Sequence, residues 1–466
     1  MARIVRRSNL RNLPAVEALL GHAALARALE RLPRPVVVEA VRAELADARA
    51  RLTREGGAAP DPAALAAQAA RRAEQAARPQ LRRVLNATGV VLHTNLGRAP
   101  LAEVARRAVS DVARGYSSLE FDLDSGRRGE RGLGVERWLT LLTGAEAALA
   151  VNNGAGAVLL ALSSLARGRG VIVSRGELVE IGGSFRIPEI LEKSGARLIE
   201  VGTTNRTHLR DYERALKGDD VAAILRVHRS NFRLDGFTAQ PDPRALSALA
   251  RKRRVPFIED LGSGALVDLA ALGLAHEPTV TESLLAGADV VTCSGDKLLG
   301  GSQAGLLVGR RRWIEKLRKD PLARALRLDK LALAALEATL PLYADPLRAA
   351  REVPALAMLA IGEDALEVRA RRLATALESR ISALTVRLVR GPGEVGGGAL
   401  PLHELPGWAV EVRHASLDAN DLQRLARSAE PPVLGIIRGG AFRLDPRALS
   451  EAELDEATGA LAAIWS

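Results

Sequence analysis

Cysteine is almost absent from this chain of 466 residues, in which Cys293 is the single one. One cysteine excludes a disulfide within the chain and any cysteine-based zinc cluster. The 7 histidines are dispersed along the sequence, which also disfavours a structural metal. We therefore expect no metal site, and we interpret Cys293, which lies in an apolar run, as a core residue.

Long hydrophobic runs are also missing. No unbroken apolar stretch approaches the roughly 18 residues that cross a membrane, and the arginine-rich start lacks the apolar segment of a secretory signal. We expect a cytoplasmic protein without membrane contacts. With 47% hydrophobic and 26% charged residues the chain is typical of globular proteins, and its length allows two or three domains.

Lysine is scarce as well: only 7 of the 66 basic residues are lysines, and the formal net charge is +11. Residues 1–85 contain 16 arginines and 8 acidic residues, so they carry a surplus of 8 positive charges. This asymmetry favours a polyanion-binding segment at that end. An arginine-rich, solvated helical bundle is the alternative.

The first part of the chain has helical apolar spacing, as in "AVEALLGHAALARALERL" and in "PRPVVVEAVRAELADARARL", which begins at a proline. The punctuating run "GGAAPDP" follows, and then an alanine- and arginine-rich helix extends to about Arg83. We predict a basic helical domain over residues 1–60 and a linker helix over 61–85.

From about Leu85 onward, short strands alternate with helical segments. This alternation predicts an α/β domain with a mostly parallel sheet, covered on both faces, over residues 86–335. After a long helical stretch from about Pro321 to Thr375, the runs "ALTVRLVR", "GWAVEVRH" and "PPVLGII" predict a smaller α+β domain over 336–466. The strands predicted in the large domain are 148–151, 171–174, 197–201, 223–228, 256–260, 289–293 and 305–309.

Lys297 follows the last buried strand but one, in "TCSGDKLLGGSQAG". A lysine next to a buried strand is costly unless it pairs or reacts, and burial lowers its pKa so that a neutral amine can condense with an aldehyde. Lys297 is thus a candidate for a covalent cofactor anchor. A surface lysine in a loop is the alternative interpretation.

Two further features accompany this lysine. Asp260 ends the strand "VPFIED", and ligands of α/β sheets bind beyond the carboxyl ends of strands. A pyridoxal cofactor requires such a carboxylate at its ring nitrogen, although an aspartate there can also be a turn cap. In "VNNGAGAVLLAL", backbone N–H groups of a strand-to-helix turn can hold a phosphate, and they are those of Asn153, Gly154, Ala155 and Gly156.

The order of phosphate turn, aspartate and lysine resembles the fold-type-I pyridoxal-phosphate enzymes. The resemblance narrows to the bacterial selenocysteine synthases, or L-seryl-tRNA(Sec) selenium transferases. It is carried by "NATGVVLHTNLGRAPL" (86–101), the run 174–216, "VHRSNFRLDGF" (227–237) and "SGDKLLGGSQAG" (294–305), and it covers nearly the whole chain.

The resemblance implies a fold-type-I large domain, pyridoxal 5'-phosphate as cofactor, and a reaction on serine esterified to a tRNA. The serine hydroxyl would be eliminated and selenium from selenophosphate added at the β-carbon. Lys297 would be both anchor and base. Asp260 would hold the ring nitrogen, and Asp296 matches the motif without a defined role.

Other residues receive roles from the same resemblance. Arg98, Arg324 and Arg327 would bind selenophosphate. Arg98 precedes a helix expected to open at Pro100, and we place Arg324 and Arg327 on one helical face. The following residues are candidates near the cofactor: His228, which can also be structural, and Ser294, Ser302 or Gln303, which can donate to its phosphate.

The resemblance also implies partners. The basic segment would contact the tRNA phosphates, and its lack of aromatic residues favours shape recognition over base stacking. A homo-oligomer, a decameric ring of dimers, is implied as well. The chain departs from the family pattern at Gly132, Gly134, Ser302 and Ile436, which leaves part of the substrate contacts open.

Two alternative functions remain at this point. A pyridoxal-phosphate lyase for a free small amino acid would use Lys297 and Asp260 but not a basic N-terminal domain. A non-catalytic tRNA-binding protein on an old enzyme fold would leave a buried lysine without chemistry, an unexplained cost.

Overall fold

The structure is a computed structural model that describes residues 10–181, 185–218, 220–401 and 403–465. The chain divides into two compact units, Met1–Arg83 and Val84–Ser466. Within the described ranges, no helix is both long enough and apolar enough to cross a membrane.

The first unit is entirely helical over its described part. Its helices are α2 (Val16–Leu20), α3 (Ala23–Leu29), α4 (Arg34–Glu55) and α5 (Pro62–Ala77). Asp61 caps α5 by accepting from the Ala64 N–H, and prolines occupy the first turns of α4 and α5, where no helical N–H is lost. Leu65 and Ala69 of α5 pack with Val41 of α4 in one core. The helix predicted within 61–85 therefore contributes to the core of this unit.

The second unit contains a seven-stranded sheet in the order β5-β13-β12-β11-β10-β6-β9. β13 pairs antiparallel with both of its neighbours, and the other pairings are parallel. All seven predicted strands are found in this sheet, so the prediction of a mostly parallel sheet is confirmed. The strands are β5 (Ala147–Val151), β6 (Gly170–Ser174), β9 (Arg197–Val201), β10 (Val221–Val227), β11 (Phe257–Gly262), β12 (Val290–Ser294) and β13 (Gly305–Gly309).

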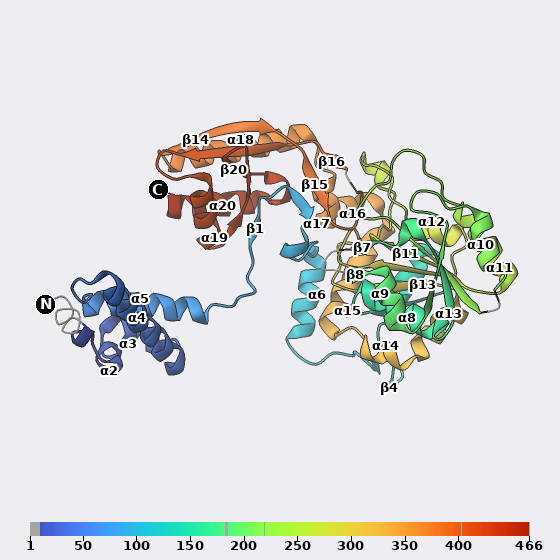
Figure 1. The fold of residues 1–466 in the computed structure, drawn as a ribbon, viewed down its shortest axis with the longest axis horizontal. Helices are drawn as coiled ribbons and strands as arrows, with labels where there is room; N and C mark the ends of the chain where they lie inside the picture. The colour runs from blue at the N-terminus through green and yellow to red at the C-terminus, as the bar shows by residue number, and fades with distance from the viewer. Residues whose placement is uncertain (1–9, 182–184, 219, 402, 466) are drawn as a thin grey trace. The chain divides into compact units, whose positions relative to one another are not determined.

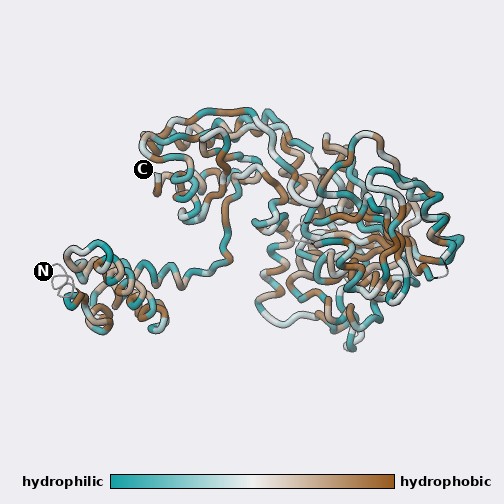
Figure 2. Tube along the Cα trace, in the orientation of Figure 1, coloured by the Kyte–Doolittle hydropathy of each residue, from teal (hydrophilic) through white to brown (hydrophobic). Residues whose placement is uncertain are grey.

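Helices cover both faces of this sheet because alternate strand residues are apolar on both sides. Leu225 and Val290 pack in one core with α8, α9 and α13, whereas Phe257 and Val291 pack in a second core with α7, α11, α12 and α15. Figure 1 shows these helices around the sheet, and Figure 2 shows the hydrophobic strands inside it. The helices and 3-10 turns are η1 (Thr94–Leu96), α6 (Glu103–Ala113), α7 (Leu133–Thr143), α8 (Gly154–Ala166), η2 (Arg175–Glu177), α9 (Ile187–Ser194), α10 (Leu209–Ala215), α11 (Pro243–Arg253), η3 (Leu269–Leu272), α12 (Val280–Leu285) and α13 (Arg311–Lys319).

The stretch predicted as long and helical is broken into short helices. Prolines at 321, 341, 346 and 354 each lie in the first turn of one, because proline cannot continue the preceding helix. The elements are α14 (Pro321–Ala325), α15 (Lys330–Thr339), η4 (Leu340–Ala344), α16 (Pro346–Glu352), α17 (Pro354–Leu359) and α18 (Glu363–Arg380).

The last part of the chain forms the four-stranded antiparallel sheet β14-β17-β20-β19, packed with α18, α19 and α20. Two of its strands match the predicted runs, while the last was missed because "AFRL" is short and follows two glycines. A second small sheet has the order β16-β15-β2. It joins residues 90–92, which precede the seven-stranded sheet in the chain, to two strands of the C-terminal part. These elements are β1 (Leu85–Asn86), β2 (Val90–Leu92), β14 (Leu384–Arg390), β15 (Gly393–Gly396), β16 (Glu404–Leu405), β17 (Trp408–His414), α19 (Ala419–Ser428), β18 (Val433–Leu434), β19 (Ile436–Arg438), β20 (Ala441–Leu444), η5 (Pro446–Ala448) and α20 (Glu451–Trp465).

Two short antiparallel strand pairs complete the described part of the unit: β3 (Phe121–Asp122) with β4 (Arg127–Arg128), and β7 (Glu180–Ile181) with β8 (Phe185–Arg186).

Candidate active site

Predicted site residues from four separate segments line one cavity of about 210 Å³ at the carboxyl ends of the strands. Lys297 and Asp260 both border it, as the sequence predicts for residues that follow neighbouring strands. The full lining consists of Arg98, Asn153, Gly154, Ala155, Val158, Asp260, Gly262, Ser294, Asp296, Lys297 and Gln303.

Lys297 lies in the turn after β12 and is 5% exposed. The Gly300 N–H donates to its carbonyl and the Leu298 N–H to the Ser263 carbonyl, so the turn is held on both sides of the lysine. Burial lowers the pKa of Lys297, and the Arg98 guanidinium lowers it further, against the attraction of three nearby carboxylates. The amine is therefore biased toward its neutral, nucleophilic form.

Asp260 lies on β11, next to β12, and is buried. Burial raises its pKa, and the opposing influences are a hydrogen bond from the Thr292 hydroxyl at 2.8 Å and the charges of Lys297 and His228. A buried carboxylate of this kind strongly favours a cationic partner. It is suited to a protonated ring nitrogen.

The turn between β5 and α8 presents the start of a helix to the cavity. Asn153 caps α8 with its side-chain oxygen, which accepts from the Gly156 N–H at 2.8 Å. The N–H groups of Gly154 and Ala155 are at the first two helical positions, have no intrahelical acceptor and border the cavity. Gly156, which was predicted to help hold the phosphate, does not line the cavity. Its N–H donates to the Asn153 side chain instead.

Arg98 and Asp296 form the opposite wall. Arg98 Nη1 donates to Asp296 Oδ2 at 2.7 Å, and Asp296 precedes Lys297 directly. Arg98 has a left-handed φ of 61° and a buried Nε that has no partner among the described residues. The expected helix does not open at Pro100: α6 begins at Glu103, because the chain between them stays extended as far as the cap Ala102.

These residues fit a pyridoxal phosphate. A Cβ at Gly154 would lie 2.9 Å from Ser294 Oγ, so glycine keeps open the space between the helix start and a hydroxyl that can donate to a phosphate. A Cβ at Gly398 would lie 2.3 Å from Lys297 Nζ. The cavity is thus lined by backbone N–H groups and a hydroxyl that can hold a phosphate, by an amine, and by a buried carboxylate.

His228 does not line this cavity. Its backbone N–H donates to the Asp260 backbone carbonyl at 2.8 Å, and its side-chain Nε2 lies 3.2 Å from Glu277 Oε1. Ser302 is likewise turned away, since its hydroxyl donates to the Ala332 carbonyl. Gln303 does border the cavity.

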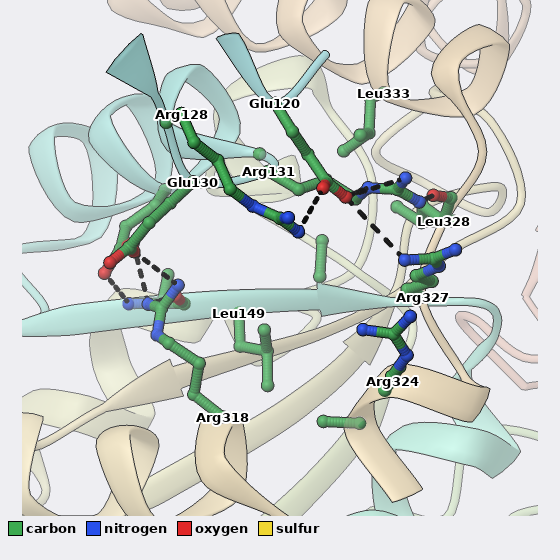
Figure 3. A pocket seen from close by; sticks show the side chains of 16 residues that line it. Glu120, Arg128, Glu130, Arg131, Leu149, Arg318, Arg324, Arg327, Leu328 and Leu333 are labelled. Carbon is green, nitrogen blue, oxygen red and sulfur yellow. Dashed lines mark hydrogen bonds and ion pairs between the residues drawn. The ribbon is translucent and has the colours of Figure 1, made fainter. Parts of the chain in front are cut away.

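Arg324 and Arg327 line a different cavity, of about 340 Å³ (Figure 3). They do not share a helical face as predicted: α14 ends at Ala325, and Arg327 forms a β-bridge with Val151. The helix stops because the Leu326 carbonyl accepts from the Asn152 N–H, which ties this segment to the turn before α8. The two cavities therefore lie on either side of the same turn.

Figure 3 shows Arg324 and Arg327 side by side at this second cavity, whose remaining cations are Arg128, Arg131 and Arg318. Glu120 lies within ion-pair distance of Arg327, at 3.7 Å. No carboxylate in the described part of the chain pairs with Arg324. The cavity is suited to a small anion.

Two departures from the family pattern line or adjoin this cavity. Gly132 caps α7 with a left-handed φ of 78°, which favours glycine. A Cβ at Gly134 would lie 2.0 Å from Glu337 Oε1, so a larger residue requires the glutamate to move. Of the others, Ser302 bonds Ala332, and Ile436 pairs with Arg443 on β19.

Sequence reasoning missed three residues of the site: Thr292, Glu277 and Gly398. Thr292 was within a predicted strand, two positions before Ser294, and its spacing could have indicated a hydroxyl beside Asp260. Glu277 and Gly398 are distant in sequence from every motif. Only the glycine run "GGG" at 396–398 offered a signal, that of a close backbone approach.

Comparison with known proteins agrees with this geometry. A family model described as L-seryl-tRNA selenium transferase matches residues 84–450, and one described as selenocysteine synthase N terminal matches residues 10–49. The solved structure of a D-glucosaminate-6-phosphate ammonia-lyase covers 83% of this chain and 96% of its own, with a TM-score of 0.55 and 19% identity. That likeness concerns the fold, which is the fold-type-I arrangement predicted from the sequence.

Curated relatives cover the chain almost completely. The L-seryl-tRNA(Sec) selenium transferase of Geotalea daltonii is 49% identical over 98% of this chain and 99% of its own length. The protein of the same name from Desulfomicrobium baculatum is 50% identical over 98% of this chain and 99% of its own. The chain therefore belongs to the L-seryl-tRNA selenium transferase family.

Proposed function

We propose that this chain converts seryl-tRNA(Sec) to selenocysteyl-tRNA(Sec) with pyridoxal phosphate as its cofactor. The observation that carries the proposal is the convergence of Lys297, Asp260 and the free N–H groups at the start of α8 on one cavity. The family's cofactor, when bound, supplies an electron sink that makes loss of an α-proton and of a β-substituent feasible.

Each side chain has a distinct task. Lys297 anchors the cofactor, and its amine, which burial biases toward the neutral form, can accept and return a proton at the serine α-carbon. With the cofactor bound, Asp260 would face the ring nitrogen as a carboxylate and keep it protonated. Gly154, Ala155 and Ser294 would hold the phosphate at the helix start, where the helix dipole would add to their hydrogen bonds.

Asp296 keeps Arg98 at the cavity wall. With its carboxylate beside Lys297, this pair also balances the charge around the amine, since Arg98 lowers and Asp296 raises the lysine pKa. A small anion that reaches the cavity would meet Arg98 with one guanidinium edge already held. We propose that Arg98 is one of the groups that receive selenophosphate.

Arg324 and Arg327 are proposed for the same donor. Leu149 and Ala150 on β5 line their cavity, and Asn153 in the turn after β5 lines the cofactor cavity, so the two cavities are a few residues apart along the chain. Selenophosphate held at Arg324 would be stored next to the cofactor phosphate. How the chain assembles, for which we propose a ring of dimers, would decide which protomer's site it serves.

The tRNA is proposed to contact the helical unit. Eight exposed arginines there have no ion-pair partner among the described residues: Arg11, Arg27, Arg31, Arg42, Arg49, Arg51, Arg54 and Arg71. Unpaired arginines on a rigid helical surface are suited to phosphate contacts. A lyase for a free amino acid would have no use for them.

The test is the visible absorbance of the purified holoenzyme after mixing with seryl-tRNA(Sec), with free L-serine as the parallel sample. A change in the cofactor band with the charged tRNA alone supports the transferase. A change with free serine and none with the tRNA would establish the lyase instead. Addition of selenophosphate should then yield selenocysteyl-tRNA(Sec).

A further inference from the structure

A buried glutamate outside the cavity connects two parts of the site. Glu277 lies in the loop between η3 and α12 and is 1% exposed. Its Oε2 accepts from the Leu400 N–H at 3.1 Å, and its Oε1 lies 3.2 Å from His228 Nε2. A carboxylate is costly to bury unless both oxygens are matched by donors or a cation.

The histidine side of this contact leads to the cofactor site. In the described part of the chain, Glu277 Oε1 and His228 Nε2 are buried without a hydrogen-bond partner, and they lie 3.2 Å apart, within ion-pair distance. The His228 backbone N–H donates to the Asp260 backbone carbonyl, and a positive charge on the His228 side chain would favour the ionised form of Asp260. Glu277 therefore lies against the side chain of a residue whose backbone is bonded to that of Asp260.

The other oxygen leads to Lys297 through residues 396–400, which we name the glycine strap. Gly398 lies against the lysine so closely that a Cβ would be 2.3 Å from Nζ. Two residues later, Leu400 has a left-handed φ of 45°, which is strained for leucine and requires an external hold. The hydrogen bond from its N–H to Glu277 is that hold.

We propose that Glu277 is a positioning residue of the reaction, whose two oxygens hold His228 behind Asp260 and the glycine strap over Lys297. One carboxylate would thereby position both Asp260 and Lys297, the two side chains proposed to contact the cofactor. The effect of Glu277 on turnover rests on the proposed function. Its effect on cofactor binding does not, and can be measured separately. Misplacement by about 1 Å in such a site lowers rates by roughly 100-fold.

The experiment compares Glu277→Gln, Glu277→Ala, His228→Asn and the Glu277→Gln/His228→Asn double variant in the full chain. Glu411→Gln is the matched control, because Glu411 is also buried but bonds Arg443 in the small sheet. Three readouts are taken: pyridoxal-phosphate affinity by titration of the apoprotein, hydrogen exchange of the strap, and kcat and KM with seryl-tRNA(Sec).

We expect Glu277→Gln and His228→Asn each to weaken cofactor binding about tenfold or more, and the double variant to equal either single one, because the two act as a unit. Exchange at Leu400 should rise in Glu277→Ala and stay low in Glu277→Gln, whose amide oxygen can accept the same bond. In turnover, kcat should fall while KM for seryl-tRNA(Sec) stays near the wild-type value.

Wild-type affinity and unchanged strap exchange in both Glu277 variants would overturn the inference, and so would single effects that multiply in the double variant. If Glu277→Ala does not fold, the isosteric Glu277→Gln and His228→Asn decide the question. A wild-type enzyme that binds the cofactor yet ignores seryl-tRNA(Sec) would contradict the proposed function and leave this measurement intact.

Discussion

At the scale of single residues, Lys297 explains why a chain with 7 lysines buries one of them. The surrounding turn desolvates the amine, and Arg98 adds a like charge, so the protonated form is disfavoured from two sides. The carboxylates of Asp260 and Asp296 act in the opposite direction and raise the pKa of Lys297. The reactivity of the residue thus comes from its neighbours and from no property of lysine alone.

Lys297→Ala should abolish covalent retention of pyridoxal phosphate, because no other lysine borders the cavity in the described part of the chain. Turnover should fall by at least about 100-fold, the usual contribution of a positioned base. Borohydride reduction followed by peptide mass analysis checks the first expectation. The exposed Lys193→Ala is the control and should be trapped like the wild type; cofactor reduced onto another lysine in Lys297→Ala would contradict the assignment.

At the scale of elements, strand ends and the turns that follow them supply most of the residues that line the cavity. The turn before α8 offers two free N–H groups because its third is satisfied by Asn153. The glycine strap follows from β15, a strand that begins more than 90 residues after Lys297 in the chain. The helix start therefore lines the cavity, and the glycine run lies against the lysine that borders it.

Gly398→Ala should weaken pyridoxal-phosphate binding by at least about tenfold. The alanine would need a left-handed φ of 93° and would place a Cβ 2.3 Å from Lys297 Nζ, so the strap must move away from the lysine. Fluorescence titration of the apoprotein measures the affinity. Gly391→Ala is the matched control, because its Cβ meets no atom within 4 Å. Equal pyridoxal-phosphate affinity of the two variants would contradict this expectation, because it would mean that the strap can move without weakening cofactor binding.

Arg42 and Arg49 are exposed on α4 and lie seven residues apart, hence on one face. Replacing both by alanine should weaken tRNA binding and reduce the slope of log Kd against log salt by about two, one for each lost phosphate contact. Filter binding at several salt concentrations gives the slope. Arg387→Ala, exposed on β14, should leave it unchanged; an unaltered slope in the α4 variant would place the tRNA elsewhere.

At the scale of the whole molecule, the turn η2 after β6 contains a buried acid that the reaction does not use. Glu177 is 2% exposed, accepts from the Val227 N–H, and burial raises its pKa to about 7, against the attraction of Arg226. The folded protein consequently holds one proton more than the unfolded chain between about pH 4.5 and 7. Stability falls as pH rises through that window.

Glu177→Gln should remove this dependence. At pH 5 the variant and the wild type should melt at similar temperatures, and at pH 8 the variant should be the more stable, by an amount on the order of 3 kcal/mol. Thermal unfolding of the apoprotein at both pH values measures the difference. Glu200→Gln, a half-exposed acid on β9, serves as the control. A constant difference between pH 5 and 8 would mean that Glu177 is ionised throughout.

Much of the fold could be predicted because its signals are local. Seven strands, the strand-to-helix turn at Asn153 and the positions of Asp260 and Lys297 follow from the spacing of apolar residues and from parallel strands ending at one edge. The predictions for Arg327 and Pro100 were wrong because the Asn152 N–H, an unexpected donor, ended one helix and extended chain up to the cap Ala102 delayed the other. Such competition depends on partners that spacing does not reveal.

The sequence by itself determined which chemistry this chain carries, since a glycine-rich turn, an aspartate and a lysine in that order already indicate a pyridoxal-phosphate site. Only the tertiary structure decided how the site is held. Glu277 meets Leu400 across 123 residues, and Arg98 meets Asp296 across 198. Contacts over such separations arise from the packing of whole elements, and no local pattern in the chain encodes them.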